Sequence, residues 1–249
     1  MRCCLLLCLF LTSALYAGPL ELTPSANALN GITLLSDDPG DCYLSPCLGV
    51  AGSSSYYFRP YNTPEIKVFG FCGANTIGSF TFAAGTNYIS HPDYVCHNPF
   101  LNAAVDVGVL SVGATAHMIS DCVQDEDAHL DFSYDLGACF SHGDSALELK
   151  ALRLGSSEKQ LCFTTAGSIA EAIIPSLSYV YEPEYKDCLR FGLKTTIHPL
   201  LTLDGSWQSE PNRFGLGIGL TLDAWNLYYG LRTHPELNIS QGIALTWDW

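Results

Sequence analysis

The feature that most constrains the fold is a two-residue alternation in which one face of a segment is bulky and the other is glycine. Between residues 214 and 222, every second side chain is large and apolar, and the intervening positions are Gly215, Gly217, Gly219 and Thr221. This period predicts a β-strand, because successive side chains point to opposite faces of a sheet. A glycine face cannot form the charged wet face of a soluble sheet. The bulky face is therefore expected to meet the surrounding medium, and lipid is the medium that suits it.

Four other segments show a similar split into an apolar and a polar face, at residues 130–136, 189–194, 225–232 and 239–249. We place the polar and glycine faces toward a lumen, and the residues assigned to it are Asp131, Asp135, Arg190, Lys194, Gly215, Gly217 and Gly219. The chain is thus predicted to be all-β, a single transmembrane antiparallel β-barrel of about 12 strands, within a range of about 10 to 14. The main alternative is a soluble antiparallel sandwich with one wet face.

Composition favours the barrel over the sandwich. Only 14% of the 249 residues are charged, whereas soluble domains average about 25%. The longest uncharged stretch, from Val68 to Pro92, is interrupted by glycine and asparagine and is not predicted to be a membrane helix. A net charge of -14 also argues against nucleic acid as a partner, because little is present to neutralise phosphates.

The N-terminus has the form of a secretory signal peptide. Arg2 precedes an apolar run from Cys3 to Leu11, and small residues follow up to Ala17. A lipoprotein cleavage at Cys8 is rejected, because the apolar run before it is too short. We expect cleavage after residue 17, an N-terminal segment at 18–52 and a barrel at 53–249. Loss of Arg2 would move the net charge from -14 to -15.

An exported chain rich in cysteine is expected to form disulfides. Eight of the eleven cysteines would remain after cleavage, and all are disulfide candidates: Cys42, Cys47, Cys72, Cys96, Cys122, Cys139, Cys162 and Cys188. Their spacing has no CxxC motif, so a zinc or redox site is not expected. The pairing stays open, and crosslinks to other envelope proteins are an alternative.

Connection lengths and aromatic residues give the barrel an expected orientation. Short turns at 198–199 and 223–224 alternate with longer connections at 208–212 and 233–237, as periplasmic turns alternate with extracellular loops. All four tryptophans lie in the last 43 residues, near expected strand ends, where they would anchor at membrane interfaces. The terminal alternation of Leu245, Trp247 and Trp249 resembles the signal by which the barrel assembly machinery recognises outer-membrane proteins.

Two stretches resemble a known family. RFGLGIGL, LYYG and THPELNISQGIALTW, within residues 189–249, resemble the closing hairpins of the PorV/PorQ-like branch of the FadL-type outer-membrane family. ANALNGITLLSDDPGDCYLSPCLGV is similar to that family's opening segment, with Ser45-Pro46-Cys47 in place of an Asn-Pro-Ala motif. The resemblance implies an N-terminal plug inside the barrel, and it attaches to Asp37, Asp38, Pro39, Ser45 and Pro46. Asp-Asp-Pro-Gly is also a plain turn signal.

Three other groups of residues are weighed and declined as sites. The run from Ser141 to Ser145 contains Ser, His and Asp but is interpreted as a polar hairpin loop, because neighbours on a strand point to opposite faces. The acidic patch of Asp121, Asp125, Glu126, Asp127 and His129 lacks EF-hand spacing and is interpreted as a solvated loop rather than a calcium site. The scattered histidines at 91, 97, 117, 198 and 234 are assigned to turns or interfaces. No cofactor, metal or enzymatic activity is expected.

Two functions are therefore expected to compete. The first is a narrow or plugged channel or transporter for small or hydrophobic solutes in the outer membrane of a Gram-negative-type bacterium. The second is a non-conducting structural or secretion-accessory barrel that makes disulfide and protein contacts in the envelope. The acidic balance predicts that a pore would prefer cations or neutral solutes.

Overall fold

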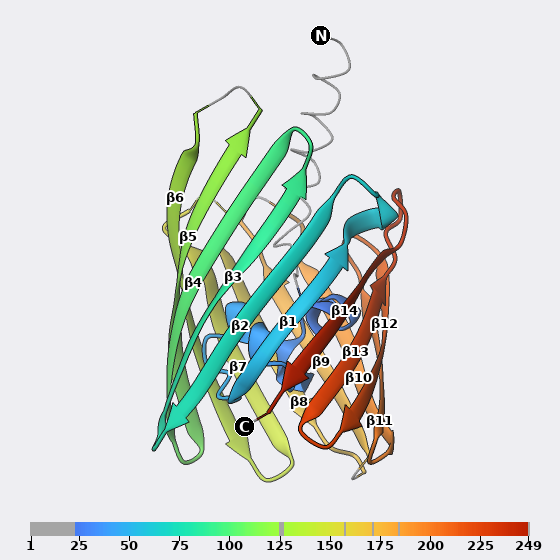
Figure 1. The fold of residues 1–249 in the computed structure, drawn as a ribbon. Helices are drawn as coiled ribbons and strands as arrows, with labels where there is room; N and C mark the ends of the chain where they lie inside the picture. The colour runs from blue at the N-terminus through green and yellow to red at the C-terminus, as the bar shows by residue number, and fades with distance from the viewer. Residues whose placement is uncertain (1–22, 125–126, 157, 171, 184, 249) are drawn as a thin grey trace.

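The computed structural model describes residues 23–124, 127–156, 158–170, 172–183 and 185–248. They form one closed antiparallel barrel in which each strand pairs with its neighbours in sequence and β1 closes against β14 (Figure 1). The first seven strands are β1 (Gly52–Arg59), β2 (Lys67–Ile77), β3 (Phe80–His91), β4 (Tyr94–Val107), β5 (Leu110–Val123), β6 (His129–His142) and β7 (Ser145–Leu154). The remaining seven are β8 (Gln160–Gly167), β9 (Ile173–Tyr181), β10 (Cys188–His198), β11 (Leu201–Gln208), β12 (Arg213–Leu222), β13 (Trp225–Arg232) and β14 (Ser240–Trp247).

The closed antiparallel all-β barrel is confirmed, but the central estimate of about 12 strands is wrong, since the barrel has 14. Several strands, most of them in the C-terminal half, are short enough to leave room for an additional hairpin. β8, β11, β13 and β14 contain 8 residues each, and turns of two residues join β10 to β11 and β12 to β13. A chain of this length therefore holds one more hairpin than longer strands would allow.

The strand faces divide as the alternation requires. On β12, Phe214, Leu216 and Ile218 are 53%, 58% and 41% exposed on the outside, whereas the intervening glycines are buried. Large apolar side chains are exposed on the outer faces of the other strands as well. An outer surface of this kind suits contact with lipid rather than water. No helix in the described ranges is both long enough and apolar enough to cross a bilayer.

The two ends of the barrel differ in their connections. At the end where β14 terminates, five of the hairpins turn within two residues, at 78–79, 108–109, 143–144, 199–200 and 223–224. The opposite end carries longer connections, including 60–66 and 233–239 (Figure 1). Over the last four hairpins, short and long connections alternate in the order expected from the sequence, whereas β3 and β4 are joined by only two residues, 92–93, at the end with the longer connections.

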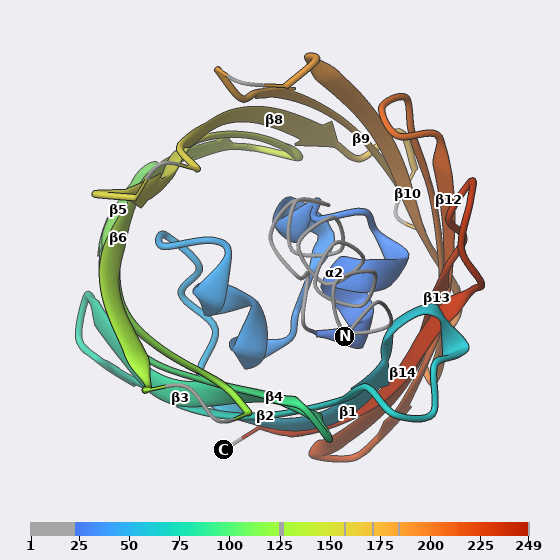
Figure 2. The same ribbon diagram turned by 90° about the horizontal axis from the view of Figure 1, so that it is seen from above.

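The interior is occupied by the part of the chain that precedes β1. Residues 23–51, called the inner segment here, contain α2 (Pro24–Ala28) and two 3-10 turns, η1 (Thr33–Leu35) and η2 (Pro39–Tyr43). Figure 2 shows these elements inside the ring of strands. The Thr23 side chain accepts a hydrogen bond from the Ala26 amide at the start of α2, and Asp38 does the same for the Gly40 amide at η2. Such short helices are stable because the surrounding wall packs against them.

Candidate functional site

The interface between the inner segment and the wall depends on glycine. A Cβ atom on Gly215 would overlap the carbonyl oxygen of Ala28, and one on Gly230 would overlap that of Pro24. On the other side of the barrel, a Cβ on Gly113 would overlap the carbonyl oxygen of Pro46. Only glycine lets two backbones approach this closely. The glycine face was expected to leave open space in the lumen, but here the inner segment fills that space.

Adding one methyl group at these glycines is expected to displace the inner segment. Gly113→Ala and Gly215→Ala should each weaken its docking by about 1–3 kcal/mol, because backbone atoms must shift to admit the new carbon. Gly73→Ala is the matched control, since a Cβ there meets nothing within 4 Å. Protease cleavage within residues 23–51 of the protein in detergent measures the effect. Equal cleavage of all three variants would contradict this description of the interface.

One buried ion pair on β7 holds the inner segment at two separate points. Glu148 and Lys150 are 1% and 3% exposed, and the Lys150 Nζ lies 3.2 Å from Glu148 Oε2. Lys150 also donates to the Thr33 hydroxyl at 2.7 Å, whereas Glu148 accepts a hydrogen bond from the Ser45 hydroxyl. Residues 12 positions apart in the inner segment are thus fixed to the same two side chains.

Further polar bonds hold the inner segment to opposite parts of the wall. From β4, Asn102 donates to the carbonyl oxygen of Pro46 at 3.0 Å, and from β5 the Thr115 hydroxyl donates to that of Cys42 at 3.2 Å. Across the lumen, the Ser206 hydroxyl on β11 donates to the carbonyl oxygen of Ala28 at 2.5 Å. Apolar contacts add to these bonds, since Leu29, Ile32 and Leu35 pack against Ala166. Water can replace the hydrogen bonds if the segment moves.

Two buried carboxyl groups organise the inner segment itself. Asp41 accepts hydrogen bonds from the hydroxyls of Thr23 and Ser25, the latter at 2.7 Å, and so joins η2 to the start of α2. Asp38 lies nearby and is 6% exposed. Burial, followed by the charge of Asp41, raises the pKa of Asp38 from 3.8 to about 7.

Docking of the inner segment is therefore expected to weaken as pH rises. Since the pKa of Asp38 is raised on folding, its contribution is complete below about pH 4, declines toward pH 7 and is absent above it. The loss amounts to at most about 4 kcal/mol. Hydrogen exchange of residues 23–51, corrected for its intrinsic pH dependence, should be slower at pH 5 than at pH 8. Asp38→Asn retains the cap and should reduce the difference, with the remainder due to Asp41, whose pKa burial also raises. An unchanged pH dependence in this variant would contradict the assignment.

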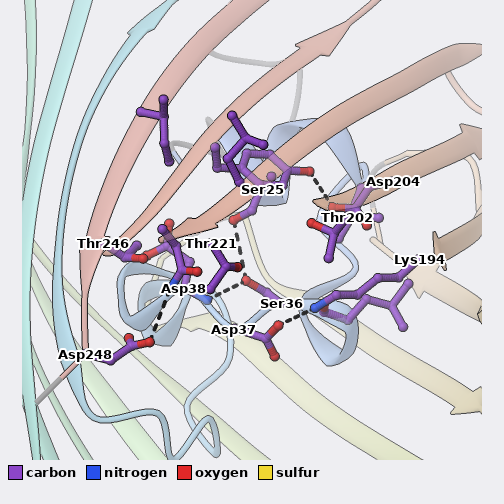
Figure 3. A pocket seen from close by; sticks show the side chains of 17 residues that line it. Ser25, Ser36, Asp37, Asp38, Lys194, Thr202, Asp204, Thr221, Thr246 and Asp248 are labelled. Atoms are coloured by element: carbon purple, nitrogen blue, oxygen red, sulfur yellow. Dashed lines mark hydrogen bonds and ion pairs between the residues drawn. The ribbon is translucent and has the colours of Figure 1, made fainter. Parts of the chain in front are cut away.

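A polar cavity of about 280 Å³ lies between the inner segment and strands β10 to β14 (Figure 3). Four carboxylates line it, from Asp37, Asp38, Asp204 and Asp248, against the single ammonium group of Lys194. Asp204 is 6% exposed, accepts a hydrogen bond from the Tyr228 hydroxyl at 2.6 Å, and has its other oxygen without a partner. The arrangement has acceptors to spare and favours a cation or a hydrogen-bond donor.

The structure brings some of the residues expected in the plug and lumen together and separates others. Lys194 on β10 pairs with Asp37 and donates to the carbonyl oxygen of Leu35 at 3.0 Å. Gly219 lines the same cavity, whereas Gly215 faces Ala28 and Gly217 faces the Tyr228 hydroxyl. Asp131, Asp135 and Arg190 are not among the cavity-lining residues. Ser45 and Pro46 reach a different part of the wall, Pro39 is buried in η2, and Asp38 is at the cavity.

One histidine assignment is wrong. His117 was expected in a turn or interface, but it lies on β5 facing the interior, where its Nε2 is 2.9 Å from Asp135 Oδ2. The period-two spacing from Thr115 places it on that face. His198 is the last residue of β10, directly before the turn to β11, and His234 lies in the connection after β13. Their Nδ1 atoms accept backbone N–H bonds from Leu200 and Glu236.

The other two declined groups lie at or near strand ends. The run from Ser141 to Ser145 forms the tight turn between β6 and β7, as the hairpin interpretation expected. Asp125 and Glu126 of the acidic patch lie outside the described residues. Within the described ranges, no group of three or more His, Cys, Asp or Glu side chains is arranged to hold a metal ion.

The aromatic end of the chain faces outward. Leu245 and Trp247 are exposed on β14, and Trp247 stacks on Trp225 of β13 with ring centroids 5.5 Å apart. Trp249 and the expected signal peptide lie outside the described residues.

Sequence reasoning missed the residues that hold the inner segment most firmly. Glu148 and Lys150 alternate with the outward Leu147 and Leu149, which is the same pattern that marked the other strands. That alternation could have placed both charges in the lumen. Asn102 offered no comparable signal, because the inward face of β4 mixes it with the apolar Phe100 and Ala104.

Comparison of whole chains shows a shared fold without close sequence relatives. No protein-family model matches the sequence, and no curated protein matches it. The Ralstonia pickettii toluene transporter TbuX is similar in structure, with a TM-score of 0.65 and 10% identity, over 93% of this chain and 99% of that chain. A mutant porin of Rh. blastica has a TM-score of 0.48 and 6% identity, over 80% and 98% of the two chains. The likeness to TbuX shows that the two chains share a barrel fold.

Proposed function

We propose that this protein is an outer-membrane barrel that acts as a narrow, plugged channel or transporter for small solutes. The observation that carries the proposal is the inner segment, which fills the lumen of a 14-strand barrel and is held there by polar bonds. A barrel of this size lies between the side-chain-filled 8-strand barrels and the open 16-strand porins, so its emptied lumen would be wide enough to pass solutes. In this proposal residues 23–51 are the plug.

The solute that suits the site is small and polar, and carries a positive charge or no charge. A cavity of about 280 Å³ is at the lower edge of the roughly 300–1,000 Å³ typical of ligand pockets. Its carboxylates outnumber its one ammonium group, which raises the local concentration of cations. TbuX is named for toluene, and an apolar solute of that kind would meet leucines in this cavity, among them Leu29 and Leu35, but would leave its carboxylates without a partner. The apolar class of solute is accordingly the less favoured one.

The proposal includes insertion in the outer membrane by the barrel assembly machinery. The outward apolar side chains support insertion in lipid, and the expected signal peptide supports export to the outer membrane of a Gram-negative-type bacterium. The exposed end of β14 supports recognition by the barrel assembly machinery through Leu245, Trp247 and Trp249. Membership of the PorV/PorQ-like branch rests on the sequence resemblance alone.

Reversal potentials in planar bilayers test the proposal. A salt gradient across the purified protein should give a potential that corresponds to cation preference. The double variant Asp204→Asn/Asp248→Asn should reduce that preference, because it removes two of the four cavity carboxylates. Asp144→Asn is the matched control, since Asp144 lies in a turn at the same end of the barrel and does not line the cavity. Anion selectivity, or equal effects of the two variants, would contradict the cationic assignment.

The alternative is a structural or secretion-accessory barrel that does not conduct. The buried ion pair and the backbone contacts at glycine favour it, because they hold the inner segment at many points. In that case neither the intact protein nor a variant with a loosened segment would carry current. Absence of conductance from both would overturn the channel proposal in favour of this one.

A further inference from the structure

Two cysteines of the inner segment each lie against a cysteine of the barrel wall. The Sγ atoms of Cys42, in η2, and Cys72, on β2, are 3.7 Å apart. Both side chains are buried, at 2% and 1% exposure, in a cluster with Ala74, Ala83 and Phe100. Sulfur atoms in van der Waals contact need only small rotations of their side chains to reach bonding distance.

The second pair lies five residues further along the inner segment. Cys47 lies against β6, where a Cβ on Gly137 would come 3.3 Å from the Cys47 backbone nitrogen, and Cys139 is two residues further along the same face of that strand. The neighbouring Cys139 thiol and burial raise the pKa of Cys47. Cross-strand pairing places Cys139 opposite Glu148, and the Cys47 Sγ is 3.5 Å from Glu148 Oε1. The same carboxylate thus places both thiols on one stretch of the wall. β2 and β6 are not neighbours, so the two pairs would attach the segment to separate parts of the barrel.

We infer that Cys42–Cys72 and Cys47–Cys139 are disulfide-forming pairs that fasten the inner segment to the barrel wall. The inference rests on the proposed function in one respect, because fastening matters to transport only if the segment is the plug. In each pair, one thiolate attacks the disulfide bond of an exported oxidant and forms a mixed disulfide between the protein and that oxidant. The second thiolate then displaces the oxidant's sulfur. Each protein pair thereby gives up two electrons and two protons, and the oxidant leaves as a dithiol.

Burial determines when the Cys42–Cys72 bond can form and break. Hydrogen bonding to Cys72 and burial raise the pKa of Cys42 well above 9.0, so little thiolate is present once the segment has docked. Oxidation is therefore expected during assembly, while the thiols still meet solvent. A disulfide formed at this time is then shielded from reductants by the docked segment. The redox state at assembly would decide whether the plug is held covalently or only by polar bonds.

Peptide mapping after refolding under two redox conditions tests the pairing. The full mature chain is refolded from urea into detergent with either reduced or oxidised glutathione. Thiols are then blocked in denaturant, and the protein is digested without reduction. The oxidised sample should give linked peptides containing Cys42 with Cys72 and Cys47 with Cys139. Random pairing among the eight cysteines, or free thiols at these four positions after oxidation, would overturn the inference.

Conductance of the same samples shows what the bonds do. The oxidised wild type should open at least about tenfold less often than the reduced protein, because a tether raises the effective concentration of the segment at the wall. Cys42→Ser/Cys47→Ser should behave as reduced in both conditions. Cys162→Ala is the control, since Cys162 packs on β8 with Leu152 and Val180, away from both pairs. Equal opening of oxidised and reduced wild type would overturn the fastening role.

The two assays separate this inference from the channel proposal. Linked peptides in a protein that never conducts would refute the channel and leave the disulfide pairs in place. Conductance in a protein that forms neither linkage would refute the disulfide pairs and leave the channel in place.

Discussion

Deleting residues 18–51 is expected to produce a steady, open pore in planar bilayers. The deletion leaves the expected signal peptide directly before Gly52, where β1 begins, and retains all 14 strands. With the inner segment gone, the glycine faces of β5, β12 and β13 have no backbone against them and the lumen fills with water. Conductance should rise by at least about tenfold over the intact chain, because an interior wider than that of 8-strand barrels is no longer filled.

Folding of the shortened chain must be shown separately from its conductance. Heat-modifiable migration on gels reports a closed barrel in detergent, and circular dichroism should show strand without added helix. Gly113→Ala combined with Gly215→Ala provides a second route to the same state, because it loosens the segment in a full-length chain. A folded deletion variant with the conductance of the intact protein would show that residues 23–51 do not limit flow.

Glu148→Ala is expected to have the largest effect of any single substitution. It leaves the Lys150 ammonium buried without its carboxylate and removes the acceptor for Ser45. Removing one partner of a buried ion pair typically costs about 3–5 kcal/mol. The inner segment should leave the lumen for a measurable fraction of the time, seen as faster proteolysis of residues 23–51 and as more frequent channel openings.

Two further substitutions test whether the effect comes from the charge of Glu148 and from its inward place on β7. Glu148→Gln keeps an acceptor for Ser45 but removes the charge that pairs with Lys150, so it should lie between wild type and Glu148→Ala. Leu149→Ala alters the outer face of the same strand, where Leu149 is 58% exposed, and should leave proteolysis of the segment unchanged. Wild-type behaviour of Glu148→Ala would mean that the ion pair does not hold the segment.

Alternation predicted the barrel because it depends only on local geometry. The inward glycines at 215, 217 and 219 could be assigned from sequence, since a strand fixes which side chains share a face. The number of strands could not be assigned from sequence, because the alternation is weak in the N-terminal half of the barrel. On β4, for example, Asn98 and Asn102 face inward among alanines and a proline that give little contrast.

The candidate site was predicted only in outline. The family resemblance implied a plug near Asp37 to Pro46, but the bonds that hold it join positions far apart in the chain. Lys150 and Thr33 are 117 residues apart, and no local pattern relates them. Gly215 lies against the inner segment, but the sequence does not show that another backbone would occupy the space beside it. The thiol contacts depend on the same long-range docking and were equally hidden.

Hydrogen exchange of the intact protein in lipid nanodiscs tests the central claim most directly, because it reports the location of the inner segment whether or not solute passes. The backbone amides of Leu29, Gly31 and Ser45 donate to carbonyl oxygens within the segment, in a region that is almost fully buried. They are predicted to exchange nearly as slowly as amides in the neighbouring wall strands β12 and β13. Exchange of residues 23–51 as fast as that of the exposed connection at 233–239 would show that the segment does not occupy the lumen, and would contradict the account.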